Sequence, residues 1–435
     1  MNATRVDEHL ERAIGPWSLG ANAVNLSLGA GIFALPAAVA ALLGPAAILA
    51  YLVCGCAIAM VLTCFAEIGS QTTRSGGAVA YLEDAFGPMA GFVAWVVFTP
   101  GFCLASDAAV ANVLIDAVGT VVPALARGVP RAGALVLIFG ALAAVNIVGV
   151  RQGVRMAVAT TVAKLAPLVL VIGAGTFAMH WQALRWPVWP STAKVGEASL
   201  LLFFAYTGAE SAVTPGGEIR NPARTIPRGL LGGTAVLIVL YASVQVMTQG
   251  VLGAQITQHA DAPLAAVAEQ VLGMAGRSLV VVCTALAGLG LLTGDILANP
   301  RTFLPVAESG MLPARLGRVH PRFRTPHVAI AVYAATTCVL AISGAFTPLA
   351  ILASISVLLI YLAVCLAALK LRLTGSRPPG SFRAPGGPLV PILGAVIVVW
   401  LLSHTSAAEA RGMALALVLA ATYYLIRRRY AGVRS

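Results

Sequence analysis

The sequence predicts an all-α membrane protein with about twelve transmembrane helices. The 435 residues are 59% hydrophobic and only 10% charged, and their mean hydropathy is +0.89. A water-soluble protein needs a more polar surface than this composition provides. Apolar runs of about 20 residues, the length that crosses a bilayer, recur along nearly the whole chain with short polar interruptions. The lipid bilayer is therefore the expected surrounding.

Each apolar run is expected to form one span. The first begins near Pro16 and continues past Pro36 without a small-residue cleavage site, so we expect a retained membrane helix and not a signal peptide. The twelve expected spans cover residues 17–42, 44–68, 88–118, 132–150, 156–178, 198–217, 229–252, 276–304, 327–344, 347–370, 388–404 and 409–427.

The charge distribution predicts the orientation in the membrane. With the amino terminus inside, about 21 of the 28 basic residues fall in cytoplasmic segments and about 6 fall outside. The net charge of +12 is therefore positive-inside bias and does not indicate nucleic-acid binding. We expect a multi-pass protein of the bacterial cytoplasmic (inner) membrane with both termini in the cytoplasm.

The sequence favours no redox, metal or enzymatic site. The seven cysteines lie in apolar runs without C-x-x-C spacing, which favours helix packing over metal binding. None of the six histidines lies deep in a span, so no acid-base or zinc arrangement is expected. No cofactor and no metal are predicted, and one membrane domain is expected to use residues 1–435.

Two glycine-containing breaks are the strongest internal signal. They lie at Leu28–Ile32 in the first span and at Tyr206–Glu210 in the sixth. Glycine lowers helix stability by about 1 kcal/mol, and an unwound turn in lipid must face protein, water or a ligand. A single G-x-G can simply allow close helix packing. Two breaks in corresponding positions indicate inverted repeats around a binding site in the middle of the membrane.

The backbone at such breaks predicts a zwitterionic ligand. Amide groups that start a half-helix favour a carboxylate, and carbonyl groups that end one favour an ammonium. The amides of Ala30, Gly31 and Ile32 would bind the carboxylate, and carbonyls near Ser27 and Thr207 would accept the ammonium. Gly208, next to Thr207, belongs to the same expected site.

Ionisable residues inside a membrane cost at least about 2.5 kcal/mol each and are functional candidates by default. Glu67 and Asp116 lie near span ends, so we expect them to reach the interface or to pair with a loop arginine. The candidates are Glu67, Asp107, Asp116, Lys164, Glu210 and Asp295.

Glu210 and Lys164 are candidates for proton coupling or gating. Glu210 directly follows the second break, where its protonation could alter the unwound turn, or where it could only tie off free amides. Lys164 lies too deep in the fifth span for easy snorkelling. Its ammonium could replace a bound cation between the first and eighth spans, or it could be a structural cation.

Asp107 and Asp295 are the candidates for contact with the substrate side chain. Neither has an evident basic partner in its own helix, and two buried carboxylates without partners are costly. A cationic substrate group would neutralise them. Pairing with other helices or with water is the alternative.

Several motifs together resemble the amino acid-polyamine-organocation transporter family. The resemblance runs from about Trp17 to about Tyr424, and the order and spacing of the motifs carry it. They are Gly29–Phe33, Phe65–Gly69, Ser75–Gly77, Phe204–Ser211, Glu218–Pro222, Gly310–Pro313 and Phe382–Pro388.

The resemblance implies a five-plus-five inverted-repeat core of the LeuT type with two extra helices. The first repeat would cover about 17–178, the second about 198–370 and the accessory helices about 388–427.

The resemblance also implies roles for single residues. Ala30 and Gly31 would meet the substrate carboxylate, and Ser27 and Thr207 would offer carbonyls to its amine. Phe204 would cover the site as a gate.

Lys164 would match a lysine that some members place where relatives bind sodium, so sodium dependence is not expected. Asp107 and Asp295 replace an asparagine and a tryptophan of the branch that exchanges arginine and agmatine. These two departures put that branch's substrate in doubt. They suit a lysine-like, ornithine-like or polyamine side chain, or else a proton pathway.

The expected function is secondary active transport of amino acids by alternating access, coupled to protons or run as an exchange, with cationic amino acids as the expected preference. A polyamine or other organic-cation transporter is one alternative, and a channel or non-transporting scaffold is another. A carrier, unlike a channel, gives saturable uptake and counterflow. The expected partners are a small-molecule substrate and the lipid bilayer, and the sequence leaves the oligomeric state open.

Overall fold

The fold was analysed on a computed structural model. It describes residues 14–29, 31–71, 76–148, 154–186, 188–214, 216, 219–260, 262–323, 325–374 and 380–432, with the backbone alone for 154–163 and 430–432. Ala30 and the motif residues Ser75 and Glu218 lie outside this described part.

Helices make up nearly all of the regular structure. In the described residues there is no β-strand, and one isolated bridge joins Ile14 to Ile219. The α-helices of the first half are α2 (Pro16–Ser27), α3 (Gly31–Leu43), α4 (Ile48–Gly69), α5 (Gly77–Phe86), α6 (Pro88–Val96), α7 (Leu104–Gly119), α8 (Gly128–Val148) and α9 (Val154–Phe177). Those of the second half are α10 (Thr192–Phe203), α11 (Pro222–Leu252), α12 (Pro263–Ala298), α13 (Phe303–Glu308), α14 (His327–Ser343), α15 (Phe346–Thr374), α16 (Leu389–Leu402) and α17 (Ala407–Gly432).

Many of these helices are apolar enough to cross a bilayer, which confirms a multi-pass all-α fold class. Seven helical runs of the described residues meet the length and composition of a membrane span, and three shorter apolar helices accompany them. The predicted number of twelve spans stays a prediction. The seven runs are Gly31–Gly69, Pro88–Gly119, Gly128–Val148, Pro222–His259, Pro263–Glu308, Phe346–Thr374 and Ala407–Arg429. The shorter helices are Lys164–Phe177, His327–Ser343 and Leu389–Leu402.

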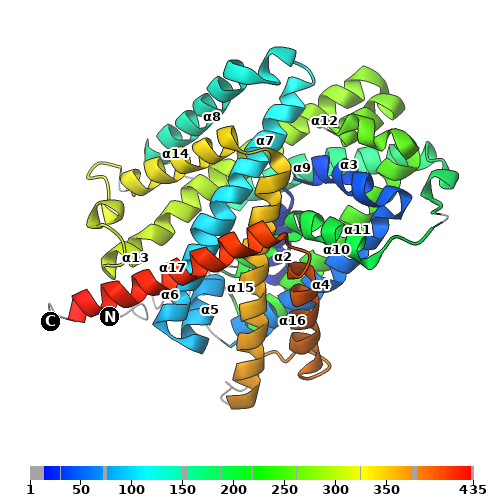
Figure 1. Cartoon of the computed structure of the whole chain (residues 1–435). Coiled ribbons are helices and arrows are strands. Elements are labelled where there is room, and N and C mark those ends of the chain that lie inside the picture. Colours follow the sequence, from blue (N-terminus) through cyan, green and yellow to red (C-terminus); the bar gives the residue numbers. More distant parts are fainter. Residues whose placement is uncertain are drawn as a thin grey trace.

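The short helix α2 lies inside the bundle (Figure 1). It packs against α11, α9 and the short helix η6 (Ala209–Val213), and α11 in turn packs against α4. α7 packs against both α12 and α15, and α14 packs against α7 and α8. These contacts place the first break among helices from both halves of the chain.

The last helix lies on the outside of the bundle. α17 packs on α6 (Figure 1), and most of its length is exposed. Near its carboxyl end the Tyr423 hydroxyl donates to the Met311 carbonyl at 2.5 Å, and Arg427 donates to the Gly310 carbonyl. One sequence motif, Gly310–Pro313, therefore anchors α17 through its backbone.

Several element bounds differ from the prediction. The eighth span was predicted over 276–304, whereas α12 already begins at Pro263 and bends at Gly273, where φ is 70°. The sixth span was predicted over 198–217, whereas α10 begins at Thr192 and its α-helical part ends at Phe203. The backbone at Gly273 is non-helical and joins two helices across a kink, so the predicted start at 276 lies close to the start of the second one. The start of α10 was predicted too late because Lys194 and Glu197 lower the hydropathy of its first turns.

A π-helical segment interrupts the predicted third span. Val97–Cys103 joins α6 to α7 and contains Pro100. Proline removes a backbone donor and forces a wider turn, and π-helical turns occur frequently at functional sites. This segment ends just before the part of α7 that carries Asp107.

Candidate functional site

The first span is interrupted where the sequence predicted it. α2 ends at Ser27, and Leu28 leaves the helical region with φ −80° and ψ 66°. The Gly29 amide donates to the Ser27 carbonyl at 2.8 Å, and helical structure resumes at Gly31. The amides of Gly31 and Ile32 thus stand at the start of α3, where the first turn of a helix has free donors.

The sixth span is interrupted in the same way. A short helix, η5 (Phe204–Tyr206), follows α10, and Thr207 is then extended. Gly208 has φ 106°, a value that favours glycine, and η6 begins directly after it. The Thr207 hydroxyl donates to the Phe204 carbonyl at 2.8 Å and fixes this turn.

The two breaks contact each other. A Cβ atom on Gly208 would lie 2.6 Å from the Leu26 carbonyl oxygen, and one on Gly31 would lie 2.9 Å from the Phe204 ring. A side chain at Gly208 would push the two half-helices apart, and one at Gly31 would displace the Phe204 ring. The structure therefore brings Ser27, Gly31 and Ile32 together with Phe204, Thr207 and Gly208.

Phe204 covers this junction together with an aromatic residue that the sequence did not indicate. Its ring is 5.9 Å from the ring of Phe346, centroid to centroid, in an edge-to-face arrangement. Phe204 is buried. Phe346 is the first residue of α15, so the two rings join the second break to the start of that helix.

The carbonyl end of α2 is already hydrogen-bonded. The Ser27 carbonyl accepts from the Gly29 amide and, at 2.8 Å, from the Tyr241 hydroxyl of α11. The Ser27 hydroxyl is buried and has no hydrogen-bond partner among the described residues. Sequence reasoning missed Tyr241, although a tyrosine within an apolar span is itself a signal because its hydroxyl needs a partner there.

Glu210 accepts a hydrogen bond from the backbone at the second break. Its Oε2 accepts from the Gly208 amide at 2.8 Å, and its carboxyl lies near the Tyr361 hydroxyl of α15, which makes no hydrogen bond among the described residues. Its Oε1 is buried and has no hydrogen-bond partner within the described part of the chain. The carboxylate therefore stabilises the unwound turn and keeps one free acceptor.

Asp107 and Asp295 face each other from α7 and α12. Their carboxyl groups lie within electrostatic range of each other, and Asp107 is fully buried. Asp107 Oδ2 accepts from the Tyr333 hydroxyl at 2.8 Å, and the Tyr333 oxygen accepts from Asn299 Nδ2 at 3.0 Å. Sequence reasoning missed both Tyr333 and Asn299.

Lys164 lies next to this acidic pair. Its side chain is buried and runs beside Gly290 of α12, and its ammonium is within electrostatic range of Asp295. Asp295 also interacts with Glu210. Asp295 thus connects Lys164 and Asp107 to the carboxylate at the second break.

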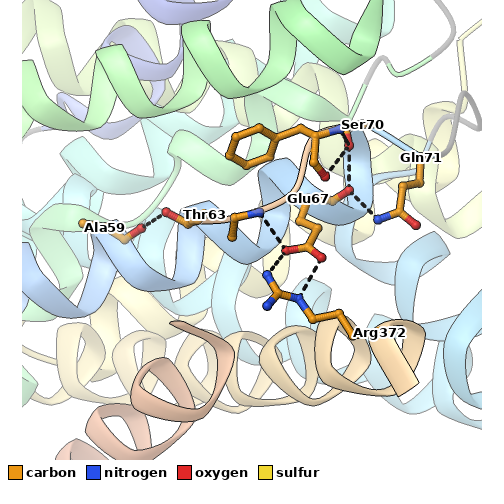
Figure 2. A network of polar contacts seen from close by, with 8 residues as sticks. Ala59, Thr63, Glu67, Ser70, Gln71 and Arg372 are labelled. Carbon is orange, nitrogen blue, oxygen red and sulfur yellow. Dashed lines mark hydrogen bonds and ion pairs between the residues drawn. The ribbon is translucent and has the colours of Figure 1, made fainter. Parts of the chain in front are cut away.

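Glu67 and Asp116 are ion-paired with arginines, as the sequence suggested, but both arginines lie in helices and not in loops. Figure 2 shows the Glu67 carboxylate of α4 directed at the guanidinium of Arg372, near the end of α15. Arg372 Nε donates to Glu67 Oε1 at 2.8 Å, a second bond joins Nη2 to Oε2, and both side chains are at least 95% buried. Asp116 binds Arg131 of α8 at 2.5 Å.

Two sequence motifs meet at the Glu67 pair. The Ala384 amide donates to Glu67 Oε2 at 3.2 Å, and the Phe382 amide donates to Ser70 Oγ at 3.0 Å. The segment before α16 is thereby held against the end of α4. Among the described residues no group of three histidine, cysteine or carboxylate side chains is placed to hold a metal ion.

The chain is similar to known transport proteins over most of its length. Residues 14–417 match a family described as amino acid permease. Over 400 residues the chain is 28% identical to a serine/threonine exchanger of Bacillus subtilis, and the aligned region covers 89% of each protein. It is 31% identical over 417 residues to an uncharacterized transporter of Mycobacterium tuberculosis, covering 93% of this chain and 89% of the relative. It is 24% identical over 421 residues to a branched-chain amino acid permease of Bacillus subtilis, covering 92% and 89%.

Proposed function

The chain belongs to the amino acid permease family, and we propose that within it this protein is a secondary active transporter that binds one α-amino acid between the two helix breaks. It is a multi-pass membrane transporter of amino acids and not an enzyme. The resemblance to the amino acid-polyamine-organocation superfamily is thereby confirmed.

The observation that carries the proposed binding site is the contact between the breaks. Gly208 approaches the Leu26 carbonyl so closely that no Cβ fits, and Gly31 does the same under the Phe204 ring. The second break therefore lies against both the end of α2, with its carbonyls, and the start of α3, with its amides. A ligand that carries a carboxylate and an ammonium matches both helix ends at once.

Each backbone group has a proposed role. The amides of Gly31 and Ile32 bind the carboxylate, together with that of Ala30, which lies outside the described residues. The ammonium binds at Thr207 and at the Ser27 hydroxyl, which is buried without a partner in the described part. The Ser27 carbonyl joins this set when Tyr241 releases it.

Proton coupling or exchange is proposed to depend on Lys164 and Glu210. An ammonium beside Asp295 occupies the place of a coupling cation, and its protonation changes the charge next to the acidic pair. Glu210 holds the Gly208 amide, so protonation there would loosen the second break. One relative is named a serine/threonine exchanger, which favours exchange as one mode.

The proposed architecture has twelve spans in a five-plus-five inverted repeat, with α16 and α17 as accessory helices and both termini in the cytoplasm. Two broken helices five spans apart support the repeat. Alternating access would then be a rocking or gating of one helix bundle against the other.

Cationic amino acids are the proposed preferred substrates. Asp107 and Asp295 place negative charge near the second break, where a substrate side chain would end. A polyamine would match these acids but has no carboxylate for the start of α3. An amino acid therefore fits the site more completely.

The test is radiolabelled uptake into proteoliposomes with an imposed inward proton gradient. Lysine, leucine, serine and putrescine are the substrates, and we expect saturable amino acid uptake and counterflow. Lys164→Ala should lose gradient-driven accumulation, whereas Lys194→Ala, at an exposed lysine in the first turn of α10, serves as the control.

The outcomes separate the alternatives. Uptake without saturation or counterflow would indicate a channel. Putrescine uptake that exceeds amino acid uptake would indicate a polyamine carrier. If Lys164→Ala retains gradient-driven accumulation, the proposed coupling role of Lys164 is wrong while the carrier stands.

A further inference from the structure

The hydrogen bonds around Asp107 fix the direction of each donor. Asn299 Nδ2 donates to the Tyr333 oxygen, and an amide nitrogen has only donors to offer. The single hydrogen of the Tyr333 hydroxyl is therefore free for Asp107 Oδ2, which accepts it at 2.8 Å. Tyr333 and Asn299 thus hold one oxygen of the Asp107 carboxyl and determine where the other points.

The second oxygen of Asp107 lacks a donor in the part of the chain that the structure describes. Oδ1 is buried and lacks a hydrogen-bond partner among the described residues. The Asp295 carboxyl lies near Asp107 and can donate a hydrogen bond only when it carries a proton. Either a proton shared by the two acids or a donor from a ligand would give this oxygen a hydrogen bond.

The charges around the pair indicate how much positive charge it takes up. Asp295 faces Asp107 from α12, Tyr333 faces it from α14, and Cys103 lies near both acids on the preceding turn. Lys164 reaches Asp295 from α9. Two carboxylates and one ammonium leave one negative charge, which is costly in a buried site and is neutralised by one positive charge.

Glu210, the third carboxylate near the pair, already accepts a hydrogen bond from the backbone. Glu210 interacts with Asp295, but its Oε2 accepts the Gly208 amide. It adds to the negative potential that draws a cation in, while its charge is stabilised by the unwound turn.

From this arrangement we propose that Asp107 Oδ1 is a single-occupancy site that binds either a proton or the distal ammonium of a cationic amino acid, with Tyr333 and Asn299 as its positioning residues. This inference rests on the proposed amino acid transport. Binding of lysine moves the shared proton from the carboxyl pair to water, and the substrate ammonium takes its place. A neutral amino acid leaves the proton in the pair.

Lysine and norleucine form a matched ligand pair for the test, because norleucine has the lysine side chain with a methyl group in place of the aminomethyl end. Each is bound to the purified full-length protein in weakly buffered detergent solution, and proton release is followed with a pH dye. We expect about one proton released per lysine bound and none per norleucine.

The pH profile gives a second readout. Because protons compete with lysine for Oδ1, lysine affinity should fall about tenfold for each unit by which the pH is lowered, over the range in which the pair is protonated. Norleucine affinity should not change with pH over the same range. Asp107→Asn should abolish proton release and lower the ratio of lysine to norleucine affinity at least about tenfold.

Tyr333→Phe tests the positioning residue. It removes the donor to Oδ2, so we expect the lysine pH profile to shift, and Asn299→Asp should shift it as well. Thr337→Val is the control, because the Thr337 hydroxyl donates only to the Tyr333 carbonyl one turn away and a merely structural loss would appear in it too. The control should keep the wild-type profile.

Two results would overturn the inference. Lysine that binds without proton release, with an unchanged affinity ratio in Asp107→Asn, places the ammonium elsewhere. Norleucine that binds while lysine does not shows that the pair takes no substrate ammonium. If neither ligand binds and no amino acid gives counterflow, the proposed function itself fails.

Discussion

Two buried carboxylate sites of this protein differ in how completely they are paired. Glu67, at the end of α4, has two bonds from the Arg372 guanidinium and one from the Ala384 amide. Asp107, in α7, has one bond from Tyr333, faces a second carboxyl group, and keeps an oxygen without a donor in the described part of the chain. Both side chains are almost completely inaccessible.

The difference separates a structural role from a functional one. A buried charge with a bidentate partner is satisfied inside the protein and holds helices together. A buried charge that is only partly satisfied gains most from binding something else, such as a proton or a ligand. The following predictions test this contrast, from the largest expected effect to the smallest.

The largest effect is expected at the satisfied pair. Glu67→Gln leaves the Arg372 charge buried without its counterion, so the free energy of unfolding should fall by about 3–5 kcal/mol. Denaturation in mixed detergent micelles measures it. Replacing both partners, with Glu67→Leu and Arg372→Met, should recover most of the loss because no unpaired charge remains. An equal loss in single and double variants would mean that the pair is not the cause.

An intermediate effect is expected at the second break. Glu210→Ala leaves the Gly208 amide buried without its acceptor, which should cost about 1–3 kcal/mol of unfolding free energy. Glu210→Gln keeps an oxygen for that amide and should retain most of the stability. If both variants lose the same amount, the Gly208 bond contributes little and the comparison with Glu67 weakens.

A small effect of opposite sign is expected at the acidic pair. Asp107→Asn removes one of two facing charges and keeps an oxygen that can accept from Tyr333. The free energy of unfolding should therefore change by no more than about 1 kcal/mol, toward higher stability. The same micelle denaturation measures it, with Glu67→Gln in parallel. A loss as large as that of Glu67→Gln would contradict the distinction drawn between the two sites.

The smallest effect is expected at the partly exposed ion pair between α7 and α8. The Arg131 and Asp116 side chains are 21% and 29% exposed, so water already screens their attraction. Asp116→Asn should cost about 0–1 kcal/mol of unfolding free energy, and added salt should reduce the difference further. A cost above that of Glu210→Ala would show that burial does not rank these carboxylates.

Much of the site could be predicted from single residues. The breaks at Leu28–Ile32 and Tyr206–Glu210 lie where glycine weakens the helix, and both are interrupted in the structure. The intramembrane charges were identified by their cost in lipid alone. Span bounds were less accurate at α10, where Lys194 and Glu197 lower the hydropathy of the first turns.

The amino-acid sequence by itself determined the all-α membrane class and the positions of both helix breaks. Those features follow from local quantities, namely hydropathy over about 20 residues and the backbone freedom of glycine. Only the tertiary structure decided the partners: Tyr333 lies 226 residues from Asp107, Arg372 lies 305 from Glu67, and Tyr241 lies 214 from Ser27. Such pairings depend on which helix faces pack together, and no local pattern in one helix specifies its neighbour's face.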